Sequence, residues 1–267
     1  MSLSEQTWVL TGAAGQIASS MRAGLAERVG TLRLLDLRPV QPEHPHEEVV
    51  VADLRNQQAV DDALTGADGV LHLGAIADEA DFHDLAEVNI VGTFHVFEAA
   101  RRAAAARVVF ASSNRTTGFY PTTTLVDADM PPRPDGLYGV SKVAGEAMGR
   151  LYADKFGLQV AALRIGSFEQ VPQDTRQLST WLSPADCLAA FLAAMTAPNL
   201  TYARFYAVSR NTRQWWDLTA GAALGYQPRD DAEDHADLVP PTSNSTERSG
   251  IQGGRYASPA YTLDRQR

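Results

Sequence analysis

The sequence contains a single cysteine, Cys187, and this scarcity limits the chemistry available to the chain. One thiol can form neither an intrachain disulfide nor a cysteine-based zinc site. Because Cys187 lies in an apolar stretch, we interpret it as a small core residue. A polar stretch at residues 78–84 contains four acids and a histidine, but their spacing fits no defined metal site. We therefore expect a solvated loop there and no bound metal.

Basic residues and long apolar runs are also scarce. The chain has 23 Lys and Arg against 32 Asp and Glu, for a net charge of −9, so it has no general attraction for nucleic acid or an anionic membrane. An anionic substrate would need local arginines. No run of about 18 apolar residues could span a bilayer. Residues 1–6 show no basic region followed by an apolar run. We expect a cytoplasmic protein without a nucleic-acid or membrane partner.

The pattern that is present is an alternation of short apolar runs and helical stretches. Of the 267 residues, 45% are hydrophobic, enough for a sizeable core. Strands are predicted at residues 7–10, 32–36, 49–52, 69–75, 107–111, 160–165 and 204–208. The helices between them include residues 56–64, 82–104, 138–156 and 184–195. This alternation predicts an α/β fold with a doubly wound parallel sheet of the Rossmann type.

A glycine-rich turn joins the first predicted strand to the first helix. Gly12 permits a tight turn, and Gly15 lets the backbone approach a pyrophosphate, which binds the N–H groups and positive end of the helix. Gln16 and Ile17 begin that helix, so we assign them to the same cofactor site. A strand, such a turn and a helix in succession are typical of dinucleotide binding.

The second predicted strand ends in Asp36, about 20 residues after Gly15. A carboxylate at this point binds the adenosine ribose hydroxyls and repels a 2′-phosphate, which favours NAD over NADP. Arg38 lies nearby, so NADP stays an alternative.

Small or polar residues also follow the other predicted strands. Because ligands bind at the carboxyl ends of parallel strands, these residues should converge on one site. The further residues assigned to the cofactor are Asp53, Leu54, Leu73, Gly74, Ala75, Ser112 and Ile165. Asp53 could contact the adenine edge. Asn89, on an apolar helix face, requires a hydrogen-bond partner and joins this group. His72, flanked by apolar residues, is interpreted as a core histidine.

Tyr138 and Lys142 are four residues apart in a predicted helix, and therefore lie on one face. An ammonium beside a phenol stabilises the phenolate and lowers the phenol's pKa from about 10. Tyr138 is thus a candidate general base for removing a proton from an alcohol. The same spacing also fits an ordinary helix start with an exposed tyrosine and lysine.

Taken in order, these motifs resemble the extended short-chain dehydrogenase/reductase family. The resemblance is carried by residues 11–15, 36, 53–54, 72–75, 89–93, 112–113 and 138–142. It implies that Ser113, Tyr138 and Lys142 form the catalytic group, that Lys142 also binds the nicotinamide ribose, and that the cofactor is NAD. It also implies a homo-oligomer, a dimer or hexamer, packed through the helices at 82–104 and 138–156. We expect residues 1–267 to form one NAD-binding domain, of which about 167–267 make a smaller substrate-binding part.

Further segments are similar to the NAD-dependent uronate dehydrogenases. They are residues 110–114, 133–142, 163–167, 178–181 and 215–217. This resemblance implies oxidation of a hexuronic acid, glucuronate or galacturonate, at C1 to an aldarolactone. The residues it implies for binding this sugar acid are Ser113, Tyr138, Asn114 and Arg115 at the sugar, Ser167 and Arg176 at the carboxylate, and Ala77 nearby. Arg115 and Ala77 depart from the histidine and the hydroxyl residue expected there.

Two alternatives remain. A nucleotide-sugar epimerase or reductase would share the N-terminal motifs, but such enzymes usually carry a larger C-terminal region than the roughly 100 residues that follow Ser167. A regulator that senses NAD without catalysis is the other alternative, and the set Ser113, Tyr138 and Lys142 argues against it.

Overall fold

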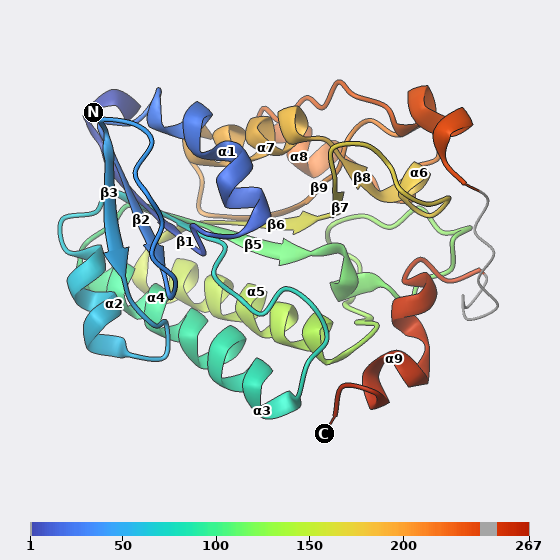
Figure 1. The fold of residues 1–267 in the computed structure, drawn as a ribbon, viewed down its shortest axis with the longest axis horizontal. Coiled ribbons are helices and arrows are strands. Elements are labelled where there is room, and N and C mark those ends of the chain that lie inside the picture. Colours follow the sequence, from blue (N-terminus) through green and yellow to red (C-terminus); the bar gives the residue numbers. More distant parts are fainter. Residues whose placement is uncertain (1, 241–249, 267) are drawn as a thin grey trace.

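The computed structural model describes residues 2–240 and 250–266 (Figure 1). A seven-stranded sheet crosses the molecule in the order β3-β2-β1-β4-β5-β6-β9, and all neighbouring strands are parallel. Its strands are β1 (Thr7–Thr11), β2 (Thr31–Asp36), β3 (Glu47–Val51), β4 (Gly69–His72), β5 (Arg107–Ser113), β6 (Gln159–Ile165) and β9 (Tyr202–Ala207). The order reverses between β1 and β4, where doubly wound folds bind their ligands. The predicted Rossmann-type sheet is confirmed.

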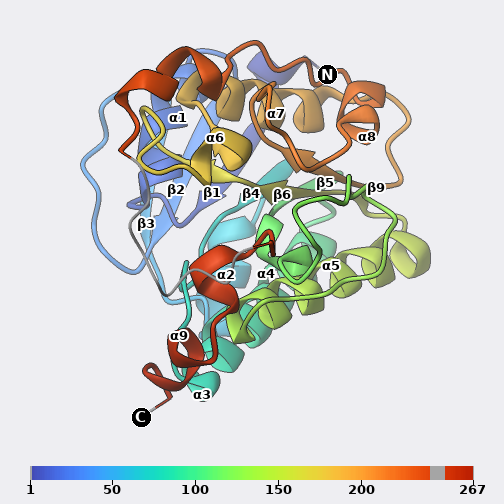
Figure 2. The same ribbon diagram turned by 90° about the vertical axis from the view of Figure 1, so that its right-hand side faces the viewer.

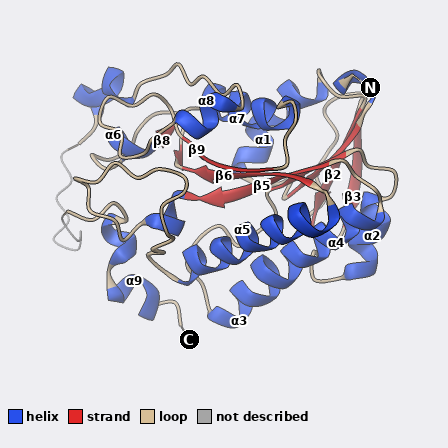
Figure 3. Ribbon diagram, turned by 180° about the vertical axis from the view of Figure 1, so that it is seen from behind, coloured by secondary structure: helices blue, strands red, loops and turns tan. Residues whose placement is uncertain are grey.

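Helices cover both faces of the sheet (Figures 2 and 3). One face carries α1 (Gln16–Ala26), α7 (Pro184–Thr196) and α8 (Thr219–Ala223). The other carries α2 (Gln57–Leu64), α3 (Phe82–Leu85), α4 (Gly92–Arg102) and α5 (Leu137–Phe156). Shorter elements at the carboxyl edge are β7 (Ser167–Phe168), α6 (Gln177–Thr180), β8 (Trp181–Leu182) and α9 (Pro259–Leu263). Because both faces are covered, the central strands β1, β4, β5 and β6 are buried on both sides, whereas the edge strand β3 is largely exposed.

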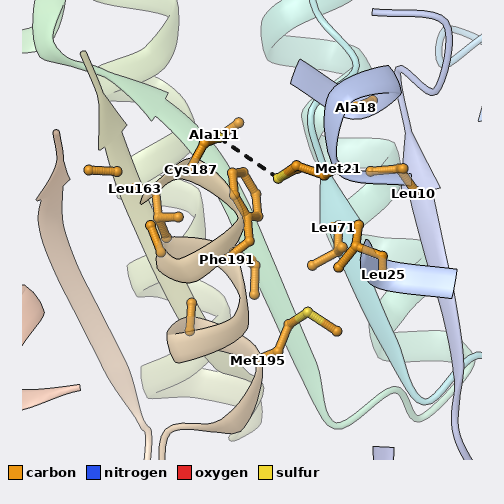
Figure 4. Packing of buried hydrophobic residues seen from close by; sticks show 14 of the residues in the cluster. Leu10, Ala18, Met21, Leu25, Leu71, Ala111, Leu163, Cys187, Phe191 and Met195 are labelled. Atoms are coloured by element: carbon orange, nitrogen blue, oxygen red, sulfur yellow. Dashed lines mark hydrogen bonds between the residues drawn. The ribbon is translucent and has the colours of Figure 1, made fainter. Parts of the chain in front are cut away.

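The core beneath α1 and α7 contains the single cysteine (Figure 4). Cys187 is fully buried, and its Sγ lies 3.8 Å from the Sδ of Met21. Leu25 and Phe191 pack in the same cluster, which joins the two helices over the sheet. The interpretation of Cys187 as a core residue is confirmed.

The stretch at 82–104 is not one regular helix. α3 and α4 are separated by a π-helical turn, Ala86–Val91, which turns Asn89 inward. The Asn89 amide accepts a hydrogen bond from the Ile76 N–H at 2.8 Å and donates to the Ile76 carbonyl at 3.0 Å and to Ser141 Oγ at 3.0 Å. The hydrogen-bond partners that Asn89 was expected to require are therefore in the loop after β4 and in α5.

One prediction for the C-terminal part is wrong, that Trp215 and Trp216 lead a helix ending at residues 224–225. Trp215 and Trp216 precede α8 instead of leading it, and Trp216 stacks on Tyr206 with ring centres 5.1 Å apart. The tail, in which the sequence shows no periodicity, forms a 3₁₀ helix at Gly254–Ala257 followed by α9. The chain that follows α9 reaches the start of α3, where the Phe82 N–H donates to Gln266 Oε1 at 3.2 Å. Residues 227–250 are rich in Pro, Asp, Ser and Thr, a composition that predicts a surface connection. Within them Ala232–Leu238 is a 3₁₀ helix, while 241–249 lie outside the described residues.

Among residues 2–240 and 250–266, no helix combines the length and apolar character needed to cross a bilayer.

Candidate active site

A cavity of about 810 Å³ runs along the carboxyl ends of the strands. Every site residue predicted from the sequence lines it except Asn89, which supports the cavity wall through Ile76. The cavity therefore brings the glycine turn, the Tyr138 helix and the Arg176 loop to one place.

The ends of β1 and β4 approach each other so closely that only glycine fits at Gly12, and little room is left at Gly74. Gly12 has φ +70°, and a Cβ added to it would lie 2.8 Å from the backbone of Gly74. A Cβ on Gly74 would lie 2.7 Å from a methyl carbon of Leu54. The exposed backbone of this turn, at the start of α1, can receive a pyrophosphate.

His72 ties these strand ends together beneath the cavity. Its Nδ1 lies 2.8 Å from Thr11 Oγ1 and its Nε2 lies 3.0 Å from Thr93 Oγ1. Burial, together with the charge of Lys142, lowers the pKa of His72 to about 3. This neutral, 1%-exposed side chain is a core histidine, as interpreted from the sequence.

Asp36 lies beside the glycine turn. Its Oδ2 accepts a hydrogen bond from the Ala14 N–H at 3.0 Å, and its Oδ1 accepts one from the Arg38 N–H at 2.9 Å. At the next strand end Asp53 pairs with Arg55 at 2.6 Å, and this guanidinium holds the pKa of Asp53 below its usual range. A glycine turn with a carboxylate at the neighbouring strand end fits an adenosine ribose and a pyrophosphate.

Lys142 is held away from the phenol that it was expected to activate. Its ammonium donates to the Ala111 carbonyl at 2.9 Å and lies 5.7 Å from the centre of the Tyr138 ring. Burial lowers the pKa of Lys142 to about 8. Burial also raises the pKa of Tyr138 to about 12, against the lowering effect of Arg115 and of the Ser113 hydroxyl. The predicted lowering of the Tyr138 pKa is therefore wrong, because desolvation of the phenolate is the larger effect.

The two serines at the end of β5 point in different directions, as neighbouring strand residues do. Ser112 Oγ donates to Glu146 at 2.6 Å, whereas Ser113 Oγ accepts from the Arg115 N–H at 3.2 Å and approaches Asn114 Oδ1 at 3.4 Å. Ser113 therefore belongs with Asn114 on the sugar side of the predicted site.

All three guanidinium nitrogens of Arg115 are paired with acids. Nε donates to Asp135 at 2.8 Å, Nη1 to Asp78 at 2.8 Å and Nη2 to Glu79 at 3.2 Å. Arg115 is only 6% exposed. The sequence placed this arginine among the sugar ligands, but in the structure its donors serve neighbouring carboxylates.

The acidic stretch after β4 is exposed at Asp78, His83 and Asp84, as expected for a solvated loop, but not at Glu79. Glu79 is 5% exposed, and its carboxylate accepts hydrogen bonds from the N–H groups of Leu137 at 2.7 Å and Tyr138 at 3.1 Å. A carboxylate at a helix N-terminus satisfies free N–H groups there. Glu79 therefore anchors the start of the helix that carries Tyr138.

Arg176 lies in the loop before α6, and its side chain lines the same cavity. Its Nε donates to the Gln252 carbonyl at 2.7 Å, and its Nη1 lies 3.4 Å from Ser167 Oγ. Ser167 and Arg176 thus meet, as the sequence predicted for a carboxylate site.

Several side chains that line the cavity were not predicted from the sequence, among them Arg55, Asp78, Glu169, Gln177 and Tyr256. Tyr256 comes from the tail, which carries no periodic signal. Within the described part of the chain, no group of three or more His, Cys, Asp or Glu side chains is arranged to hold a metal ion.

Comparison with known proteins identifies the family of the chain. The sequence pattern of the NAD dependent epimerase/dehydratase family matches residues 8–185. The chain belongs to this family. It is 39% identical to a uronate dehydrogenase of Pseudomonas putida over 253 residues, which cover 93% of this chain and 94% of the relative. It is 42% identical to a uronate dehydrogenase of Agrobacterium fabrum over 252 residues, covering 93% and 95%.

A solved structure is equally similar. The crystal structure of a mutant uronate dehydrogenase from Agrobacterium tumefaciens complexed with NAD has a TM-score of 0.90 and 41% identity, over 95% of this chain and 97% of that one. The protein is an NAD-dependent oxidoreductase.

Proposed function

We propose that the protein oxidises a free hexuronic acid, glucuronate or galacturonate, at C1 to the aldarolactone, with NAD as cofactor. The observation that carries this proposal is the meeting of Arg176 and Ser167 in the same cavity as Tyr138 and the glycine turn. Uronate dehydrogenases that match the chain nearly end to end support it.

The proton chemistry is assigned to Tyr138. Its phenolate takes the proton of the C1 hydroxyl, and the C1–O bond gains double-bond character as that carbon is oxidised. Ser113 donates a hydrogen bond to this oxygen. Bound NAD supplies the electron acceptor. Arg115, 5.2 Å from the ring centre, and the Ser113 hydroxyl favour the phenolate against the cost of its burial.

The carboxylate of the substrate is assigned to Arg176. A guanidinium binds a carboxylate through two parallel hydrogen bonds, and Ser167 beside it can donate another. Asn114 is assigned to the sugar hydroxyls. Each guanidinium nitrogen of Arg115 donates to an acid, so we assign Arg115 to orienting Tyr138 and the loop at Asp78. Ala77 is assigned to the cavity wall beside the sugar.

The test follows NADH absorbance with free uronic acids, neutral aldoses and nucleotide sugars. We expect turnover with uronic acids, and we expect Tyr138→Ala to lose nearly all of it while still binding NAD. An epimerase makes no net NADH, so tightly retained NAD after purification together with protection by a uridine diphosphate sugar would favour the epimerase or reductase alternative. An absence of turnover across the panel without these two signs would favour an NAD-sensing regulator.

We also propose a homo-oligomer assembled through α4 and α5, with the part of the chain after Ser167 supplying the smaller substrate-binding region. Phe94 of α4 and Val140, Leu151 and Phe156 of α5 are each more than a third exposed. A monomer in light scattering would contradict this assembly.

A further inference from the structure

A short C-terminal segment, residues 252–256, lies along the side chain of Arg176. The Gln252 carbonyl accepts the Nε–H of Arg176 at 2.7 Å. A Cβ added to Gly254 would lie 3.2 Å from Arg176 Cδ, so this part of the segment packs on the aliphatic stem. The centre of the Tyr256 ring lies 5.4 Å from Arg176 Cζ. Alternate residues of the segment therefore contact successive parts of one arginine.

The beginning of this segment is firmly held. Gln252 is 1% exposed, and its side-chain amide donates to the carbonyls of Pro121 at 3.1 Å and Thr124 at 2.9 Å. Its backbone N–H donates to the Tyr120 carbonyl at 2.9 Å. The carbonyl that receives Arg176 thus has a fixed position.

The far end of the segment rests on Arg115. The Tyr256 ring centre lies 4.6 Å from Arg115 Cζ, and Arg115 is itself fixed by Asp78, Glu79 and Asp135. One aromatic ring therefore lies within cation–π distance of both arginines at this end of the cavity. The Tyr256 ring therefore connects Arg176, a long side chain on a loop, to Arg115, which is immobilised by its ion pairs.

We propose that Tyr256 is a positioning residue for Arg176, and that it sets how strongly the site prefers a sugar acid to a neutral sugar. The inference rests on the proposed function, since it assigns the carboxylate to Arg176. A guanidinium that is already held by a carbonyl and a ring loses less conformational freedom when it binds a carboxylate. Tyr256 itself need not touch the reacting atoms.

The test compares two substitutions at this position. Tyr256→Leu removes the ring and should raise the uronate KM about tenfold while kcat and NAD affinity stay near those of the wild type. Tyr256→Phe keeps the ring face and should restore the wild-type KM. The matched control is Tyr261→Leu, because the Tyr261 ring packs edge to face against Tyr256, with ring centres 5.0 Å apart, and also contacts Arg115. Its uronate KM should change by less than about threefold.

A double-mutant cycle with Arg176→Ala decides the mechanism. If Tyr256 acts through Arg176, Tyr256→Leu should change the uronate KM no further once Arg176 is alanine. An unchanged KM in Tyr256→Leu, additive effects in the double variant, or loss of NAD binding would overturn the inference and leave the proposed function standing. Failure of the wild-type protein to oxidise any uronic acid would overturn both.

Discussion

Glu146 neutralises a buried charge behind the catalytic end of β5, and its removal should strongly destabilise the fold. Its carboxylate, in a side chain 3% exposed, receives Arg164 Nε and Nη2, both at 2.9 Å, and Ser112 Oγ at 2.6 Å. Arg164 is fully buried, whereas Arg204, 3.3 Å from the same carboxylate, is partly exposed. In Glu146→Leu the Arg164 charge would remain buried without its anion.

Removing one partner of a buried ion pair costs about 3–5 kcal/mol. Each kcal/mol lowers the melting temperature of a domain of this size by about 2–4 °C, so we expect a decrease of about 6–20 °C by calorimetry. The double variant Glu146→Leu, Arg164→Met should lose less than Glu146→Leu alone, because no unpaired charge is left at Arg164.

The matched control is Arg150→Met, which breaks an exposed pair with Asp154 on the same helix and should cost less than about 1 kcal/mol. A Glu146→Leu protein as stable as this control would refute the reasoning. So would a double variant whose loss equals the sum of the two single losses.

Three further predictions concern the cofactor and the base. The kcat/KM for uronate should rise with pH from about 6 to 8, because the phenol of Tyr138, with a pKa of about 12, must lose its proton. The rise should weaken as Lys142, with a pKa of about 8, loses its charge. A kcat/KM that falls over that pH range would contradict this. Asp36→Asn should reduce the preference for NAD over NADP by about tenfold, measured as the ratio of kcat/KM values, since the charge that repels a 2′-phosphate is gone; an unchanged ratio would argue against that role. Gly12→Ala should abolish NAD binding in calorimetry, because its Cβ would meet the Gly74 backbone at 2.8 Å; wild-type affinity would show that the turn can adjust.

The sheet and the cofactor side of the cavity could be predicted because their signals are local. Gly12 and Gly15 follow a strand directly, and Asp36 ends the next one. Parallel pairing then brings these strand ends to one edge without any further information. The one exception is Asn89, whose role depends on an irregular helical turn that periodicity does not report.

The sugar side could not be predicted in the same way, because its contacts join distant segments. Glu79 reads as one acid among several, yet it is buried because α5 begins directly against it. The spacing of Tyr138 and Lys142 gives a shared helix face but not the direction of the lysine, which donates to Ala111. Tyr256 approaches Arg115 only after the tail has folded back across the cavity.

The π-helical turn at Ala86–Val91 makes the chain sensitive to length at the cavity wall, which Val88 lines and Asn89 supports. Such a turn contains one residue more than an α-helical turn, and one residue rotates the following side chains by about 100°. A single-residue deletion there would restore regular winding and swing Asn89 away from Ile76. The loop that carries Glu79 would then lose one of its tethers while keeping the contacts of Glu79, so the length of this turn helps to set the position of the sugar side of the cavity.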